Sequence, residues 1–171
     1  AAPLLGAAVN SPFLFGKRLW QESRIPLFEQ SVAAGGFGGA AFGPIRRAGF
    51  GDYARHGFGE LFTDNLEHYP VLLPEIRDEP PESLPHLRLH NGTIWRWVRP
   101  LVGNDTDGTP HLRLEQRILP AGPSPVDAVA NAALFYGLVR VLGEDARPPE
   151  ADLEHATARE NFYRAAKHGL G

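Results

Sequence analysis

Hydrophobic and polar residues alternate with a period of two along residues 109–118, which read TPHLRLEQRI. Successive strand side chains point to opposite faces of a sheet, so Leu112, Leu114 and Ile118 are predicted to share the buried face of a strand. The residues that share its other face are Arg113, Glu115 and Arg117. Neighbours on one face of a strand lie about 7 Å apart. These three charges therefore form either a solvated surface or the floor of a polar site.

A second alternating run precedes the first and reads LRLHNGTIWRWVRP over residues 87–100. Leu87 and Leu89 alternate with polar residues, and Asn91-Gly92 allows a turn or bulge. Farther along, Ile94, Arg96 and Val98 are expected on one face, and Thr93, Trp95, Trp97 and Arg99 on the other. The two runs are joined by the turn-rich VGNDTDGTP, so we expect them to pair antiparallel as a hairpin. Two tryptophans on one strand face are more typical of core packing than of a ligand platform.

Helical patterns occupy the two ends of the chain. Residues 12–33 are predicted to be helical, with Ser11 as the N-cap and a kink or helix break at Pro26. A short helix is expected over residues 58–69, ending before Pro70. The order of helices, then strands, then helices indicates the α+β class with an antiparallel sheet.

The clearest helix signal follows Ser124. Ser124 as N-cap, Pro125 in the first turn and Asp127 as a capping-box partner predict a helix that runs to Leu142 and stops at Gly143. Apolar residues occupy most of the circumference of this helix, so we expect the helix to be well buried. A final amphipathic helix ends at Gly169.

Residues 34–59 are rich in glycine and keep no periodicity, which predicts a mobile loop inside a single partial catalytic domain spanning residues 1–171. The loop has no GxGxxG and no GK[ST] motif, so it is not a nucleotide-binding loop of either familiar kind.

Composition and charge exclude several classes of function. The chain has 171 residues, a formal net charge of −3 and no cysteine. This excludes a disulfide framework and a thiol nucleophile, and no basic footprint for nucleic acid or an anionic membrane is present. No apolar stretch is expected to reach the roughly 18 residues of a membrane span. The apolar start lacks the basic region of a signal peptide and does not begin with Met, so we expect a cytoplasmic location and a piece of a longer protein.

The charged residues of the two strands suggest one chemistry. Arg96 and Arg99 come into the same small sheet as Arg113 and Arg117, all around Glu115. Four guanidinium groups carry more positive charge than one carboxylate neutralises, so an anion such as a phosphate or substrate carboxylate would complete the cluster. Glu115 would then need a divalent cation between itself and that anion. The competing interpretation is a solvent-facing strand edge with weak salt bridges.

Three stretches together resemble the bacterial glutamate–cysteine ligase-like carboxylate–amine ligases. They are SPFLFGKRLWQESRIPLFEQS, HNGTIWRWVRPLVG and PHLRLEQRILPAGPSPVDAVANAALFYGLVRVL. The resemblance implies part of a glutamine-synthetase-like catalytic domain, with an antiparallel sheet and flanking helices. It also implies ATP and Mg²⁺ as cofactors, and joining of the γ-carboxylate of glutamate to cysteine or another amine through a γ-glutamyl phosphate, as in glutathione biosynthesis.

The same resemblance implies roles for four residues. Glu115 would be a ligand of an active-site Mg²⁺, and Arg117 would contact the transferred phosphoryl group. Arg99 and Arg96 would hold phosphate or substrate carboxylate. Residues 1–89 supply none of the family's further metal-binding acids, so this polypeptide alone is expected to be incomplete. The alternatives are a non-catalytic anion- or nucleotide-binding protein that kept the fold, and a structural module without a ligand.

Overall fold

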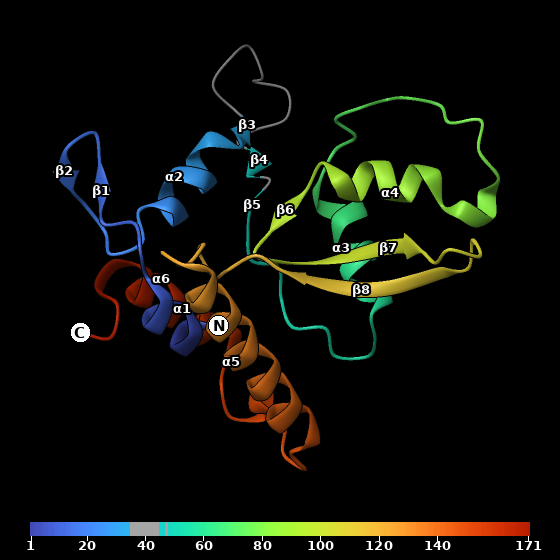
Figure 1. The fold of residues 1–171 in the computed structure, drawn as a ribbon. Helices are drawn as coiled ribbons and strands as arrows, with labels where there is room; N and C mark the ends of the chain where they lie inside the picture. Colours follow the sequence, from blue (N-terminus) through green and yellow to red (C-terminus); the bar gives the residue numbers. More distant parts are fainter. Residues whose placement is uncertain (35–44, 47) are drawn as a thin grey trace. The chain divides into compact units, whose positions relative to one another are not determined.

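The computed structural model describes residues 1–34, 45, 46 and 48–171. The described helices and strands, in chain order, are α1 Ala2–Ala8, β1 Phe13–Leu14, β2 Lys17–Arg18, α2 Arg24–Ser31, β3 Ala33–Ala34, β4 Ile45–Arg46, β5 Ala48–Gly49, α3 Gly59–His68, α4 Pro85–Gly92, β6 Trp95–Arg96, β7 Val98–Asn104, β8 Pro110–Gln116, α5 Pro125–Glu144 and α6 His155–His168 (Figure 1). Short 3₁₀ turns occupy Pro81–Ser83 and Pro149–Ala151. The chain divides into a terminal unit, Ala1–Phe28 with Ile118–Gly171, and a central unit, Glu29–Arg117.

The β7–β8 hairpin is the longest strand pair of the central unit, and it confirms the predicted antiparallel pairing. Its register sets Arg99 opposite Glu115 and Leu101 opposite Arg113. The connecting turn closes where the Asp105 amide donates to the Thr109 carbonyl at 2.9 Å, and Gly108 takes a positive φ of 86° that suits glycine. The Thr109 amide donates to Asp107 in the same turn and lowers the pKa of that carboxyl below its usual value.

A helix, α4, stands where the alternation of Leu87 and Leu89 predicted a strand. Pro85 occupies its first turn, where the missing N–H costs nothing, and the preceding Leu84 has left-handed backbone angles. Pro85 and Leu89 have the i, i+4 spacing of one helix face. The strand prediction for residues 87–92 was therefore wrong. Two leucines two residues apart fit a helix as well as a strand.

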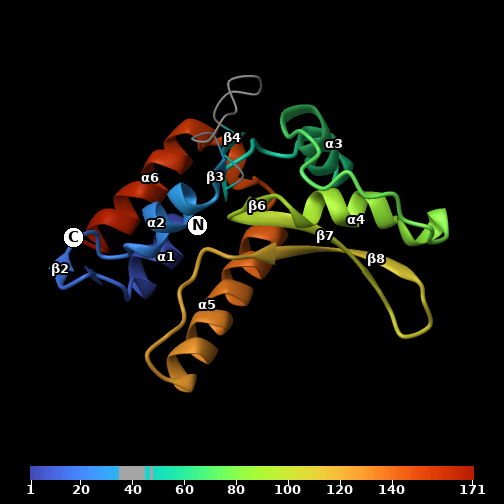
Figure 2. The same ribbon diagram turned by 90° about the horizontal axis from the view of Figure 1, so that it is seen from above.

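Helices α3 and α4 both pack against β7 in the central unit, as the two ribbon views show (Figures 1 and 2). A buried amide network joins the three elements. The Asn65 side chain donates to Asn91 Oδ1 at 2.9 Å, and Asn91 Nδ2 in turn donates to the Pro100 carbonyl at 2.6 Å. Because buried polar groups are costly without partners, this chain of bonds fixes the positions of α3 and α4 on the strand.

The carboxylate of Glu60 organises the entrance to α3. It accepts backbone N–H bonds from Arg55, His56 and Gly57, and these bonds lower the pKa of Glu60 below its usual value. The helix ends at His68, two residues before Pro70, which confirms the predicted helix in this segment.

We expect Gly51→Ala to destabilise the central unit. A methyl group built on Gly51 would overlap Arg96 Nη1 and lie 3.2 Å from Asp64 Oδ2, so the buried Arg96–Asp64 ion pair would have to shift. Forcing extra volume into a packed site costs about 1–3 kcal/mol. Urea unfolding followed by circular dichroism measures the loss. Gly57→Ala, where the added methyl meets nothing, is the control, and equal stability of the two variants would contradict the packing argument.

In the terminal unit, α1 and α6 lie side by side (Figures 1 and 2). Leu4 and Leu5 of α1 are buried together with Phe162 and Ala166 of α6. Helix α6 is amphipathic and is followed by Gly169, as predicted.

The predicted helix over residues 12–33 is correct only in its second half. Residues 13–18 form a two-stranded hairpin, β1–β2, whose turn has positive φ at Phe15 and Gly16. Helix α2 begins at Arg24, so Pro26 lies within its first turn and causes no break. Ser11 does not cap a helix at Pro12, because a strand follows it; its hydroxyl donates to Glu22 and accepts from the Arg24 amide at the start of α2.

Helix α5 starts as predicted but is not buried. Ser124 caps it by accepting from the Asp127 amide, and none of its twenty residues is buried. By length and composition alone it is apolar enough to cross a membrane, contrary to the expectation that no such stretch exists. That signal is weak by itself, because a helix from the core of a larger protein passes the same test.

The α+β class is confirmed, in a coarser form than predicted. The described strands form two-stranded sheets, three antiparallel and one parallel, rather than one extended antiparallel sheet. The likeness to glutamine synthetase and the single partial catalytic domain stay predictions. The predicted mobile loop, residues 34–59, includes residues 35–44 and 47, which lie outside the described part of the chain.

Candidate functional site

The centre of the candidate site is an ion pair across the β7–β8 hairpin. Arg99 and Glu115 are direct cross-strand partners, and Arg99 Nε donates to Glu115 Oε2 at 2.5 Å. Directly opposed strand residues have side chains close enough to interact, so the register itself creates this pair. The Arg99 side chain is 16% exposed and that of Glu115 is 37% exposed, so the pair lies partly sheltered at the surface of the hairpin.

Arg117 joins the pair from the same strand. It lies one residue past β8 and two residues after Glu115, and its Nε lies 3.5 Å from Glu115 Oε2. The Arg117 amide donates to the Trp97 carbonyl at 2.9 Å, which extends the hairpin pairing and keeps Arg117 in strand alternation. We call Arg99, Glu115 and Arg117 the hairpin cluster. It sets two guanidinium groups beside one carboxylate.

Arg96 does not join the hairpin cluster. Its side chain is 4% exposed and forms an ion pair with Asp64 of α3, and its guanidinium lies 5.4 Å from the centre of the Tyr69 ring. His68 Nδ1 also lies 2.9 Å from Asp64 Oδ1. Arg96 is therefore neutralised by Asp64 inside the central unit, whereas Arg99 and Arg117 both contact Glu115.

Asp64 is the partner that the sequence did not indicate. It lies in the predicted helix over residues 58–69, but nothing in the local spacing linked that helix to the strand that carries Arg96. A pairing across 32 residues depends on tertiary packing, which a local pattern does not encode.

The two faces predicted for the strand over residues 109–118 are only partly confirmed. Arg113 shares the face of Glu115 but is exposed, and its contact is with His111 at 3.4 Å. On the opposite face Ile118 is buried, whereas Leu112 and Leu114 are more than half exposed. Trp97 is 1% exposed and donates through Nε1 to Glu29 at 2.7 Å, which confirms its predicted role in the core.

The hairpin cluster fits Mg²⁺ only as a part of a site. Glu115 Oε2 is taken by arginine contacts, while Oε1 accepts no hydrogen bond from the described residues. This oxygen is suited to a hard divalent cation. Among the residues that the structure describes, no group of three or more His, Cys, Asp or Glu side chains could hold a metal ion. Residues 35–44 and 47 contain none of these four residue types either.

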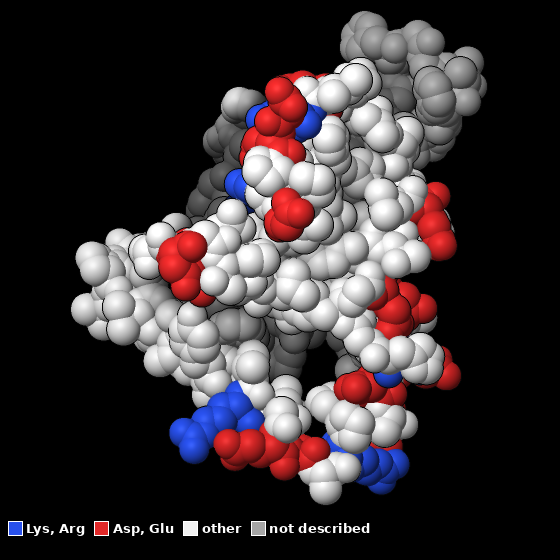
Figure 3. Space-filling model, turned by 90° about the vertical axis from the view of Figure 1, so that its right-hand side faces the viewer, with Lys and Arg blue, Asp and Glu red and all other residues white. Residues whose placement is uncertain are grey.

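The same cluster fits a phosphate or carboxylate anion. Its two guanidinium groups lie on one side of the hairpin and present planar donors to a single carboxylate. On the face drawn in Figure 3, the described Lys and Arg side chains occur in small groups beside acidic ones, without a broad basic patch.

The comparison with protein families identifies the chain. The family model described as Glutamate-cysteine ligase family 2 (GCS2) matches residues 1–171, which is the whole chain. No curated protein and no solved structure matches it. Ligases of this family use ATP and Mg²⁺. The match agrees with the resemblance carried by the strand of Glu115 and the helix that follows it, and the chain belongs to glutamate–cysteine ligase family 2.

Proposed function

We propose that the chain forms part of the active site of an ATP-dependent carboxylate–amine ligase that joins the γ-carboxylate of glutamate to cysteine or another amine. The observation that carries the proposal is the hairpin cluster, in which Arg99 and Arg117 share the carboxylate of Glu115 in a chain of this family. The reaction passes through a γ-glutamyl phosphate, and the amine then displaces phosphate from the acyl carbon.

The cluster suits the electrostatics of this reaction. A carboxylate that attacks the γ-phosphoryl group of ATP brings two anions together, and fixed guanidinium groups stabilise the charge where they meet. We assign Arg117 the contact with the transferred phosphoryl group and Arg99 the contact with phosphate or substrate carboxylate. Both side chains are already oriented by Glu115, so little reorganisation is needed when an anion arrives.

Glu115 would hold Mg²⁺ through the oxygen that accepts no bond from the described residues. Bound Mg²⁺ would supply Lewis-acid neutralisation of the phosphate oxygens. One carboxylate is too few for a metal site, and the described part of the chain holds no group of three or more His, Cys, Asp or Glu side chains placed to bind a metal ion. We propose that the remaining ligands come from elsewhere in the full-length protein, which makes the 171 residues alone catalytically incomplete.

Arg96 is the predicted site residue with the weakest geometric support. Its guanidinium forms an ion pair with Asp64, and its side chain is nearly inaccessible to solvent. We retain it as a proposal for a supporting role only, since contact with phosphate or substrate carboxylate would require the Asp64 pair to open. The need for ATP favours a cytoplasmic location, which we also propose.

The experiment is ADP release by the full-length protein, measured with ATP, Mg²⁺, glutamate and a panel of amines. We expect release to require all four components, and Arg117→Gln to lower kcat/KM by about 100-fold, the scale for loss of one charge-stabilising group. Arg113→Gln is the matched control, because Arg113 shares the strand face but lies outside the hairpin cluster.

The lack of a complete set of metal ligands among the described residues favours a second candidate, a non-catalytic anion- or nucleotide-binding protein. It would bind ATP in an Arg117-dependent manner without releasing ADP in the presence of any amine. Such a result from the full-length protein would replace the ligase proposal.

A further inference from the structure

A cavity lies in the central unit, between α4 and β7. Its volume is about 300 Å³, near the lower end of the range for small-molecule sites. Its walls come from the acidic connector (Arg77 and Glu79), from α4 (Pro85, Arg88, Leu89, Asn91 and Gly92) and from β7 (Leu101 and Val102). No residue of the hairpin cluster lines it, so we treat it as a separate site, the α4 cavity.

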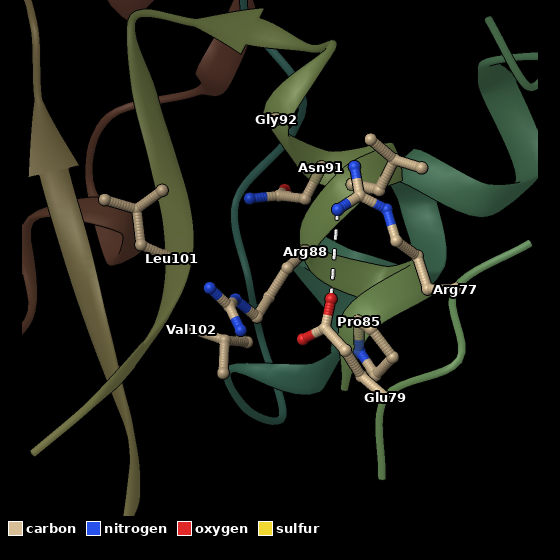
Figure 4. Close-up of a pocket in the computed structure, with 9 residues that line it drawn as sticks. Arg77, Glu79, Pro85, Arg88, Asn91, Gly92, Leu101 and Val102 are labelled. Carbon is tan, nitrogen blue, oxygen red and sulfur yellow. Dashed lines mark ion pairs between the residues drawn. The ribbon is translucent and has the colours of Figure 1, made fainter. Parts of the chain in front are cut away.

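Arg88 is the unneutralised charge of the α4 cavity. Figure 4 shows its side chain reaching from α4 toward Val102 on β7. Its guanidinium forms no ion pair with any described residue, whereas Arg77 Nε lies 3.0 Å from Glu75 and Arg77 Nη1 lies 3.8 Å from Glu79. A guanidinium group that faces a concave site without a carboxylate of its own is suited to an anionic ligand.

The rest of the lining limits what that anion can be. Glu79 places a negative charge in the cavity, paired loosely with Arg77 in Figure 4, and would repel a multiply charged phosphate. Pro85, Leu89, Leu101 and Val102 supply apolar walls. Asn91 is already committed, because it accepts from Asn65 and donates to the Pro100 carbonyl. One spare positive charge beside hydrocarbon walls matches a single carboxylate on a short apolar body.

We propose that the α4 cavity binds a small organic monocarboxylate, with its carboxylate on Arg88 and its hydrocarbon chain against Leu89 and Leu101. The buried amide network holds α4 on β7, so the cavity is formed before the ligand arrives. This inference does not depend on the ligase activity, because none of its residues belongs to the hairpin cluster.

The test is a titration of the full 171-residue chain by ¹⁵N–¹H NMR with 3-methylbutanoate as the probe. We expect shifts of the amides of α4 and of Leu101 and Val102 that saturate in the millimolar range. Arg88→Gln should weaken binding by about tenfold or more, since it removes a charge-assisted bond. Arg140→Gln, which removes an exposed arginine of α5 in the terminal unit, should bind like the wild type.

Two further ligands separate the contribution of the ligand's charge from that of its apolar body. 3-Methylbutanol has the same apolar body without charge, and inorganic phosphate has charge without the apolar body. The proposal requires both to bind at least about tenfold more weakly than the carboxylate. It is overturned if the alcohol binds equally well, if phosphate binds with the same dependence on Arg88, or if no shift saturates. Because Arg88 is an exposed side chain, its replacement leaves the fold intact, and unchanged circular dichroism verifies this.

Discussion

Replacing Glu115 by glutamine is expected to abolish Mg²⁺-dependent ligase turnover in the full-length protein, by at least about 100-fold in kcat. Glutamine keeps the shape of the side chain but removes the negative charge that would bind the cation. It also frees Arg99 and Arg117 from their shared partner, so the two guanidinium groups lose their common orientation. The measurement is ADP release at several Mg²⁺ concentrations.

A loss of folding would not explain this result. The Glu115 side chain is 37% exposed, and ion pairs of this kind contribute about 1 kcal/mol or less to stability. We therefore expect the unfolding midpoint of Glu115→Gln to stay close to that of the wild type. Glu144→Gln, which breaks an exposed pair with Arg140 on α5, is the matched control and should keep full turnover. Normal turnover of Glu115→Gln would refute the metal role.

The sequence predicted those features of the candidate site that are local or set by register. Strand alternation placed Glu115 and Arg117 on one face, and the predicted hairpin brought Arg99 into the same small sheet, where the structure sets it opposite Glu115. Both follow from period-two geometry and a turn-rich connection, which require no knowledge of distant residues. The partner of Arg96 was missed because Asp64 lies on α3, 32 residues earlier in the chain, and meets Arg96 of β6 only in the folded central unit.

The largest errors in the fold came from apolar patterns with two interpretations. Leu87 and Leu89 fit a strand or a helix, and Pro85 decides for the helix because it suits a first turn. A helix that is apolar on all sides predicts burial, yet none of the residues of α5 is buried. The sequence predicts that the apolar surface of this helix is covered, but a local pattern does not identify the partner that covers it.

Substituting glutamine for Glu22 is expected to cause the largest loss of stability, about 3 kcal/mol in the free energy of unfolding. Glu22 lies in the terminal unit and is 0% exposed. Its carboxylate accepts from the Asn10 amide at 2.9 Å and from Ser11 Oγ at 2.5 Å, and Arg24 Nε lies 3.4 Å away. A glutamine amide would turn an NH₂ group toward one of these donors and leave the partly exposed Arg24 without its charged partner.

The position of Glu22 explains why the effect would spread through the terminal unit. Its backbone amide donates to the Ala166 carbonyl of α6 at 2.8 Å, so the same residue joins the loop at Asn10 and Ser11 to the last helix. Urea unfolding, together with hydrogen exchange at the amides of α1 and α6, measures the loss. Glu160→Gln, on the exposed side of α6, should change the unfolding free energy by less than about 0.5 kcal/mol. If Glu22→Gln were equally mild, its carboxylate would not be the group that holds this unit together.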